Sequence, residues 1–452
     1  MKAASKSFAD RLLIALLFLL LAERVLVFFQ LGTEYFGYGD DESYIKSGLT
    51  FVETGVISLN SPYPSAMIMP GMPVLIGLLS IFFGSGTELV TAIRILWIVL
   101  GVFNAYIVYR TVNLICVDCR WAGLFGAAHF LLPNMAWMNQ IVMTETPYMF
   151  FFTLCLYYTI QMSASDSRKY GILYVISFLL ALMFRANILV MAFFTGGYLL
   201  CQKRLTVKKC LIFALSLLVF LIPWTVRNAH FFHAFVPLTY GTGHPLLLGT
   251  YQGEGYPADE EMDYDSYVDG VIKKQYASYF HEPVASDIGD SYEFQNYVSD
   301  SLVKEPQCVQ YLRHQIYASI AKYRLSRWWQ QNNVSLLKSY LYIKPRMMIN
   351  WVWEWDEVLG IKIETLHRVY QINALFCAFT VILSLVLKEY RFTVFALGGL
   401  YLLSVYITAM AFVNDRYGST LMSIRFILAG VGFALVWKAL SGAGRLRQRG
   451  NT

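Results

Sequence analysis

The chain has 452 residues, of which 57% are hydrophobic and only 15% are charged, and its mean hydropathy is +0.48. This composition excludes an ordinary soluble globular protein and indicates a polytopic membrane protein. The formal net charge of +6 needs no nucleic-acid partner, because basic residues on cytoplasmic loops produce such a balance in membrane proteins.

The first predicted element is an apolar helix from Phe8 to Phe29, long enough to cross a bilayer. Basic residues precede it, and the acidic triplet Asp40-Asp41-Glu42 follows it within the string Tyr38 to Tyr44. The positive-inside rule therefore places the N-terminus in the cytoplasm and the acids on the extracytoplasmic side. Carboxylates at the mouth of a span often do chemistry, and a solvated acidic turn is the alternative.

The next apolar segment, Met67 to Phe83, is interrupted by Pro70, Gly71, Pro73 and Gly77. We expect it to be a broken, partly re-entrant helix at the outer surface, because counting it as a span would place most of the basic loops outside. The chain would then have about ten spans, with the later ones near residues 89–109, 121–138, 146–162, 171–184, 187–201, 208–226, 367–387, 392–412 and 419–438.

Hydropathy divides the chain into three parts. Residues 1–226 form an N-terminal transmembrane module whose first external loop covers residues 31–88. Residues 227–365 form an extracytoplasmic domain that we expect to be mostly helical, and residues 366–452 contain the last spans and a basic cytoplasmic tail. The aromatic string Trp351 to Trp355 is most simply an interfacial belt beside the returning span, with a sugar platform as the alternative.

In this topology several ionisable residues lie at the outer ends of helices. Such groups are costly at membrane depth unless they are paired or functional, so together they predict a polar site. For Glu145, helix capping and dipole compensation explain the residue equally well. Arg185 has no such explanation, and we expect it to bind an anion. The residues are Asp40, Asp41, Glu42, Glu145, Arg185, Arg227, Asp415 and Arg416.

Several motifs, in this order, resemble those of GT-C glycosyltransferases that use polyprenyl-phosphate sugars, such as protein O-mannosyltransferases and the lipid A aminoarabinose transferase. The resemblance covers essentially the whole chain. It departs in two places, because Tyr417 is not followed by the usual proline and Arg185 is followed by alanine. The motifs are Asp40 to Tyr44, Phe51 to Gly55, Met69 to Pro73, Thr144 to Pro147, Phe184 to Asn187, Pro223 to Asn228, and Asp415 to Tyr417.

The resemblance implies an all-α GT-C fold and an inverting transfer of one sugar. The donor would be an undecaprenyl- or decaprenyl-type phosphate sugar, and the acceptor a hydroxyl of a glycan, lipid or protein outside a bacterial-type inner membrane. An acid of the first loop would be the general base, and its position before Tyr44 favours Asp41, with Asp40 or Glu42 orienting it. The expected phosphate ligands are Arg185, Arg227 and Arg416, and the expected substrate-binding residues are Tyr44, Glu145, Asn228 and Tyr417. Arg425 would either bind the lipid phosphate or pair with a helix neighbour.

We expect no cofactor. Asp40 and Asp41 could hold a divalent ion, but nothing else in the sequence indicates a metal. The main alternative function is a flippase or transporter of lipid-linked saccharides, which should carry polar residues at mid-membrane and often inverted repeats. A second alternative is an O-antigen-type polymerase or ligase, which differs in using an oligosaccharide donor.

Overall fold

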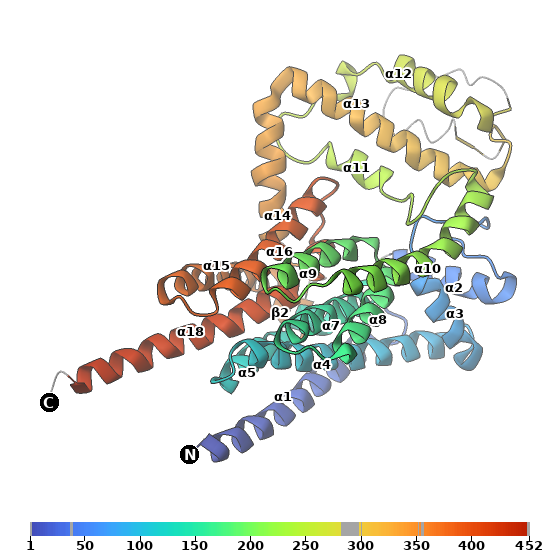
Figure 1. Cartoon of the computed structure of the whole chain (residues 1–452). Coiled ribbons are helices and arrows are strands. Elements are labelled where there is room, and N and C mark those ends of the chain that lie inside the picture. The colour runs from blue at the N-terminus through green and yellow to red at the C-terminus, as the bar shows by residue number, and fades with distance from the viewer. Residues whose placement is uncertain are drawn as a thin grey trace.

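The computed structural model describes residues 2–36, 39–281, 298–299, 301–350, 352–353 and 357–449, and Figure 1 shows that it consists almost entirely of helices. Tyr38, Trp351, Glu354 and Trp355 lie outside the described residues. The one sheet in the described part is a hairpin in which β1 (Glu357–Val358) pairs antiparallel with β2 (Ile361–Lys362). The predicted all-α class is therefore confirmed.

Six of the described helices are long and apolar enough to cross a membrane. The predicted count of about ten spans stays a prediction, because the other four predicted spans are shorter, broken or less apolar. The six are α1 (Lys2–Leu31), α4 (Thr87–Ile115), α10 (Val207–Phe232), α15 (Ile363–Leu387), α16 (Arg391–Ala409) and α18 (Met422–Arg449). The other four are the broken run of α5 (Arg120–Ala128), η1 (His129–Leu131) and α6 (Pro133–Met138), then α7 (Glu145–Ala164), α8 (Arg168–Phe184) and α9 (Leu189–Cys201).

Two contacts show that α1 and α4 run antiparallel. Near the start of α1, Asp10 accepts a hydrogen bond from Arg120, which follows the end of α4. Beyond the end of α1, the carbonyl of Gly32 accepts one from Arg94, in the second turn of α4, at 2.7 Å. The chain between the two helices therefore leaves and re-enters the bundle at the same end.

That connecting chain forms α2 (Gly39–Thr54) and α3 (Gly71–Phe83). The 13 residues of α3 are about 20 Å long, which is too short for a hydrocarbon core of about 30 Å. The expectation that this segment is a re-entrant helix at the outer surface stays a prediction. The two helices pack through glycines, since a Cβ atom on Gly48 would lie 2.5 Å from Ile76.

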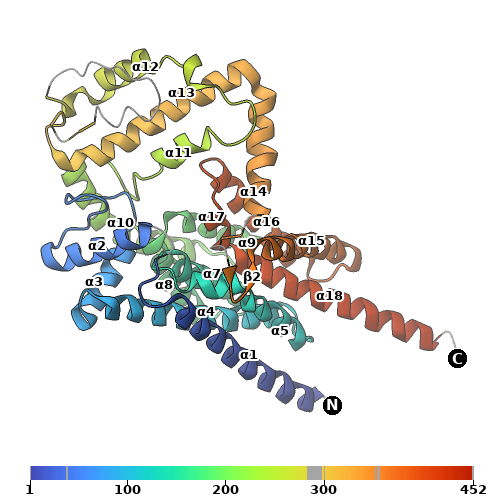
Figure 2. The ribbon, with the colours of Figure 1, turned by 180° about the vertical axis from the view of Figure 1, so that it is seen from behind.

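The loops that carry the predicted cytoplasmic bases gather at one end of the bundle, which we call the terminal end. Asp166 pairs with Arg204 at 2.5 Å, and Lys438 pairs with Glu389 at 2.7 Å. Both chain termini lie at this end (Figures 1 and 2). We call the opposite end the site end. The described bases of the terminal-end loops include Arg110, Arg120, Arg168, Lys169, Lys203, Arg204, Lys208, Lys209, Lys388, Arg391 and Lys438.

At the site end, a helical unit with its own hydrophobic core stands on the membrane bundle (Figure 2). Its main helices are α11 (Gly243–Gly249), α12 (Tyr264–Val271) and α13 (Val309–Lys338), whereas α14 (Lys344–Asn350) packs in the core of the membrane bundle. Shorter elements are η2 (Ala186–Ile188), η3 (Asp259–Glu261), η4 (Ile272–Tyr276), η5 (Ala277–Tyr279), η7 (Pro306–Cys308) and η8 (Ser339–Ile343). Buried Arg324 ties α13 to the preceding loops, since it donates to the Pro257 carbonyl at 2.7 Å and to Asp259 at 2.6 Å.

Candidate active site

The acidic triplet forms the first turn of α2, where the helix dipole favours negative charge. Neighbouring residues on a helix point in different directions, and the three carboxyl groups therefore meet different surroundings. The side chain of Asp40 is 55% exposed and that of Glu42 is also exposed, whereas Asp41 is fully buried. Of the three acids, Asp41 is thus the one that solvent does not reach.

Asp41 points into the protein toward the segment before α7. Its Oδ2 accepts a hydrogen bond from the Val142 backbone N–H at 3.1 Å, and its Oδ1 has no hydrogen-bond partner in the described part of the chain. Burial raises the pKa of Asp41 to about 7, although the Val142 amide and the charges of Arg416 and Arg94 act to lower it. The carboxyl group therefore changes its charge near neutral pH.

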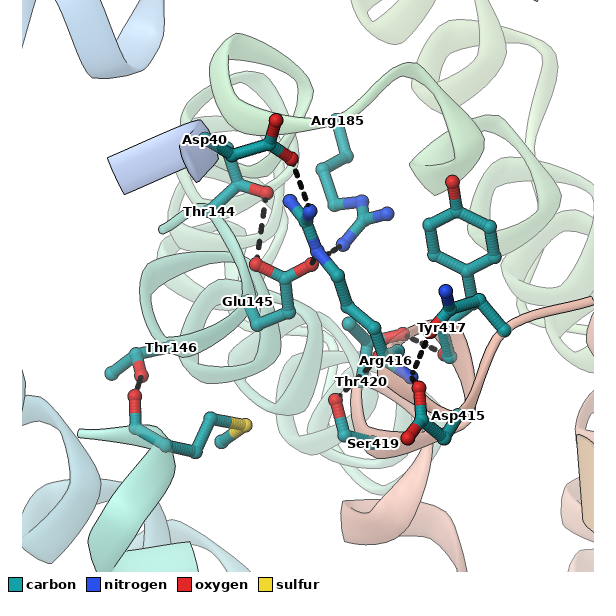
Figure 3. A network of polar contacts seen from close by, with 12 residues as sticks. Asp40, Thr144, Glu145, Thr146, Arg185, Asp415, Arg416, Tyr417, Ser419 and Thr420 are labelled. Carbon is teal, nitrogen blue, oxygen red and sulfur yellow. Dashed lines mark hydrogen bonds and ion pairs between the residues drawn. The ribbon is translucent and has the colours of Figure 1, made fainter. Parts of the chain in front are cut away.

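Glu145 is the first residue of α7 and lies at the centre of the site. Its carboxylate is 1% exposed and accepts hydrogen bonds from Arg185 Nη1, at 2.5 Å, and from Arg416 Nε (Figure 3). The hydroxyl of Thr144 donates to the other oxygen at 3.3 Å. Glu145 therefore joins two guanidinium groups that come from distant parts of the sequence.

Arg416 reaches this carboxylate from α17 (Asp415–Ser419). The side chain of Asn414 caps the helix, since its Oδ1 accepts a hydrogen bond from the Arg416 N–H at 3.0 Å. The guanidinium also donates from Nη1 to Asp40 at 2.5 Å, and its side chain is 14% exposed. Asp40, Glu145, Arg185 and Arg416 together form what we call the acid–arginine network.

Arg185 follows the last residue of α8 in an extended conformation, and its side chain is 16% exposed. Its guanidinium carbon lies 5.2 Å from the centre of the Tyr417 ring and 5.9 Å from that of Tyr148. Among the described residues, Glu145 is the one hydrogen-bond acceptor that contacts it. Arg185 therefore keeps N–H groups that can meet an anion arriving at the site.

Two further predicted residues lie near the network. Tyr44 is buried one turn beyond Asp40 on α2, and burial raises the pKa of its hydroxyl group, on which the charges of Arg416 and Glu145 also act. Tyr417 stacks against Arg185 and is half-buried. The structure thus brings together most of the predicted site.

Arg227 and Asn228 are not part of this network. Arg227 donates to the carbonyls of Ser65, at 2.8 Å, and Ile57, at 3.0 Å, while Asn228 donates to the Val236 carbonyl at 2.9 Å. Both residues therefore hold external loops against the end of α10. Their contacts do not match the predicted roles in phosphate and substrate binding.

Arg425 contacts neighbouring helices, which is one of the two roles that the sequence analysis left open for it. It is 1% exposed, and its donors reach Asn373 Oδ1 at 2.9 Å, the Ile349 carbonyl at 3.0 Å and the Tyr370 carbonyl. Each of its three nitrogen atoms thus has a protein acceptor, and Arg425 joins α18 to α15 and α14.

Trp353 corrects the interpretation of the aromatic string. It is 1% exposed, stacks edge-on against Trp137 at 4.9 Å, and lies 5.9 Å from the guanidinium carbon of Arg416. A residue of an interfacial belt would face lipid, whereas Trp353 forms the wall behind Arg416. The tryptophan-rich composition indicates an aromatic cluster but does not show which way each ring points.

Sequence reasoning also missed Lys344, a buried lysine between the external unit and α17. Its ammonium donates to the carbonyls of Gly249, at 3.0 Å, and Ala411, at 2.5 Å, and lies 3.8 Å from the centre of the Tyr340 ring. Burial lowers the pKa of Lys344 to about 7. No motif surrounds this lysine, so no sequence signal could have revealed it.

A second contact reinforces the one at Lys344. The side chain of Gln252 donates to the Val413 carbonyl and accepts from the Val413 N–H, both at 2.7 Å. The segment from Ala411 to Val413 leads directly into Arg416, and the external unit therefore holds the backbone that carries this arginine. We call the contacts of Lys344 and Gln252 with this segment the linker clamp.

Arg24 is a further charged residue that the sequence analysis missed, and it lies inside the apolar helix α1. It is fully buried and donates to Asn139 Oδ1 at 2.8 Å, to the Phe130 carbonyl at 3.1 Å and to Glu23 at 3.1 Å. These bonds pin the irregular buried segment that precedes Glu145. Arg24 therefore supports the site from behind and does not line a polar path.

The site as a whole presents one exposed carboxylate, from Asp40, beside two partly exposed guanidinium groups. Such a set can bind a phosphate and accept a proton from a hydroxyl group nearby. Within the residues that the structure describes, no three His, Cys, Asp or Glu side chains gather in a way that could hold a metal ion.

No protein-family model matches the chain, and no curated protein sequence matches it. It resembles the crystal structure of ArnT from Cupriavidus metallidurans bound to undecaprenyl phosphate, with 13% identity, a TM-score of 0.41, and coverage of 94% of this chain and 78% of ArnT.

It also resembles the oligosaccharyltransferase AglB from Archaeoglobus fulgidus, solved with an inhibitory peptide and a dolichol-phosphate. The identity is 11%, the TM-score is 0.46, and the match covers 98% of this chain and 52% of AglB. The chain therefore spans about half the length of AglB.

Proposed function

We propose that the chain is a membrane glycosyltransferase that moves a sugar from a polyprenyl-phosphate carrier to an acceptor hydroxyl at the site end of the bundle. The acid–arginine network is the observation that carries this proposal. It brings an exposed carboxylate and two guanidinium groups together at the site end of the bundle, where they would meet the phosphate of a lipid carrier held in the membrane.

The two arginines bind the donor phosphate in this proposal. Glu145 holds both guanidinium groups from the buried side, so they are oriented before the donor arrives. Guanidinium groups match phosphate oxygens bidentately and stabilise the negative charge that develops as the phosphate leaves. Arg227 and Arg425 have no role in this proposal, because each already donates to backbone carbonyls of the protein.

We assign the general base to Asp40 instead of Asp41. A general base must come within hydrogen-bond reach of the hydroxyl group that it deprotonates. Asp40 is open to solvent, whereas Asp41 is covered by the protein. A phosphate that binds Arg416 competes with Asp40 for its guanidinium and so releases the carboxylate to accept the proton. Direct attack of the hydroxyl opposite the leaving phosphate would invert the anomeric carbon.

The test is a transfer assay in reconstituted membranes with a panel of undecaprenyl-phosphate sugars, in which release of undecaprenyl phosphate is measured. Asp40→Asn should lower the rate about 100-fold to 10,000-fold, as the loss of a general base does. Asp166→Asn, at the terminal end, is the matched control and should keep the parental rate. Full activity of Asp40→Asn with loss in Asp41→Asn would return the role of base to Asp41, and full activity of both would refute the mechanism.

The positive-inside rule further supports an extracytoplasmic site, because the basic loops lie at the terminal end. Single cysteines in a background without native thiols can test this orientation with an impermeant maleimide on intact cells. Lys322→Cys, in α13, should react from outside, while Ser165→Cys should be protected. Labelling of Ser165→Cys alone would reverse the orientation.

A further inference from the structure

The end of α13, which connects the external unit to the membrane bundle, is kinked and lies crosswise to the predicted spans. At Asn332, α13 is interrupted by a non-helical backbone with φ −154° and ψ 79°. Beyond this kink, residues 333–343 connect α13 to α14, and we call this segment the leg. Figure 1 shows the leg in orange, crosswise to the long helices α4 and α18. A helix crosswise to membrane spans runs along the membrane plane.

The leg exposes a row of large apolar side chains. Val334 is 72% exposed, Leu337 43% and Leu341 56%. Their spacing of three and four residues places them on one face of the helix. The other face is covered by the protein, since Ser339 and Tyr340 are buried. A contiguous exposed apolar face of this kind marks a surface that another apolar phase covers.

A contact with α16 shows how deep the leg lies relative to the predicted spans. Tyr406 donates a hydrogen bond from its hydroxyl to the Leu341 carbonyl at 3.1 Å. Tyr406 lies three residues before Ala409, where α16 ends, which corresponds to about 4.5 Å along the helix. The end of the leg at Leu341 therefore lies at the depth where a predicted span leaves the membrane.

The part of α16 beside this contact also exposes apolar side chains. The residues of α16 beside this contact include Leu403, which is 47% exposed, and Ile407, also 47% exposed, and Met410 directly after the helix is 60% exposed. In a membrane span such residues face lipid. The same lipid phase that covers α16 therefore extends to the foot of the leg.

Polar side chains lie beside the apolar row of the leg, as is typical of helices at a membrane surface. Arg346 lies 5.8 Å from the centre of the Tyr342 ring and donates to the Tyr342 hydroxyl at 3.1 Å. Lys338 pairs with Glu254 at 2.5 Å on the side of the external unit. Tyrosine and arginine beside an apolar face are typical of the headgroup region.

We propose that the leg is an interfacial helix that inserts Val334, Leu337 and Leu341 into the lipid leaflet at the site end. Amphipathic helices of this kind bury their apolar face about 5 to 10 Å into the boundary between headgroups and acyl chains. The occupant is lipid and not a second copy of the chain, because a partner protein would also have to cover the lipid-facing side of α16. This proposal does not depend on the proposed enzymatic function.

The test uses the full chain in lipid nanodiscs, with an environment-sensitive fluorophore on single cysteines in a background without native thiols. Leu337→Cys and Leu341→Cys should give blue-shifted emission, quenched more by nitroxides near the headgroup than by nitroxides at the chain end. Lys322→Cys, exposed on the upper part of α13, is the control and should be quenched by neither lipid. These positions are exposed, so the substitutions leave the core intact.

Two results would overturn the proposal. Labels at 337 and 341 that are quenched no more than the label at 322 would show that the leg stands clear of the membrane. Blue-shifted labels that no nitroxide lipid quenches would show that a protein partner covers the leg. Chemical crosslinking of Leu337→Cys between two chains in detergent and in nanodiscs would then identify that partner as a second copy or exclude it.

Discussion

The two ends of the membrane bundle carry the same kinds of charges in very different surroundings. At the terminal end, Arg204 and Asp166 form an isolated ion pair whose side chains are 39% and 72% exposed. At the site end, one nearly buried carboxylate, Glu145, is shared by two arginines that are themselves largely covered. The comparison shows that an ion pair alone does not indicate a functional site. A buried carboxylate that pairs with two arginines is a stronger indication.

Physical chemistry assigns different energies to the two arrangements. Exposed ion pairs contribute about 0 to 1 kcal/mol to stability, because water screens them. Removing one partner of a buried pair costs about 3 to 5 kcal/mol, because the remaining charge is left without water or a counter-ion. A protein gains little stability from burying such charges, and their retention at the site end is consistent with a functional role.

The largest effect is expected from Arg416→Ala. This change leaves Asp40 unpaired and Glu145 with one arginine, and we expect a loss of about 3 to 5 kcal/mol of unfolding free energy. Arg120→Ala is the matched control at the terminal end. Denaturant unfolding in detergent measures the unfolding free energy of both variants. If the two variants lost equal amounts of unfolding free energy, the two ends of the bundle would not differ in the strength of their ion pairs.

The next effect depends on pH and concerns Asp41→Asn. The folded protein holds the proton of Asp41 up to about pH 7, while an unfolded chain releases it near 3.8, so stability should fall as pH rises between these values. The difference corresponds to about 4 kcal/mol. Asparagine removes this penalty and can still accept the Val142 N–H.

Unfolding of the parent and of Asp41→Asn should therefore be compared at pH 5 and pH 8. We expect the variant to be more stable than the parent at pH 8, with the gap shrinking toward acidic pH. A difference that is the same at both pH values would mean that the buried carboxyl group is not what titrates.

A smaller effect is expected on the affinity for undecaprenyl phosphate when Arg185 is changed. Arg185→Ala should weaken undecaprenyl-phosphate binding by about 1.5 to 3 kcal/mol, roughly tenfold to a hundredfold, because a charge-assisted contact is lost. Arg185→Lys should restore part of the affinity, since lysine lacks the planar fork. Unchanged affinity in Arg185→Ala would exclude this arginine as a phosphate ligand.

The smallest effect is expected at the terminal end. Arg204→Ala removes an exposed partner of Asp166 and should change the unfolding free energy by about 0 to 1 kcal/mol, less so at high salt. The measurement is unfolding at low and high ionic strength. A loss as large as that of Arg416→Ala would show that exposure does not distinguish the two ends.

Sequence reasoning predicted which residues lie at the same end of the bundle. Alternating spans fix the side on which each helix end falls, and this is how Asp40, Glu145, Arg185 and Arg416 were expected to converge. The same logic predicts that Met67 to Phe83 is a re-entrant helix at the outer surface, and this stays a prediction.

What the sequence could not provide was the direction of each side chain and the identity of its partner. Asp40 and Asp41 are adjacent and chemically identical, yet a rotation of about 100° per helical residue exposes one and buries the other. Likewise, Arg227 and Arg425 bind backbone carbonyls, and such acceptors are present at every position of a chain. Only the folded arrangement distinguishes them from Arg185.

The linker clamp leaves no room at Gly249. A Cβ atom there would lie 2.1 Å from the Ala411 carbonyl oxygen and 3.0 Å from Lys344 Nζ, so even a methyl group would force the two parts of the protein apart. A side chain at position 249 would therefore act at a distance, by displacing the backbone that carries Arg416 without touching the acid–arginine network itself.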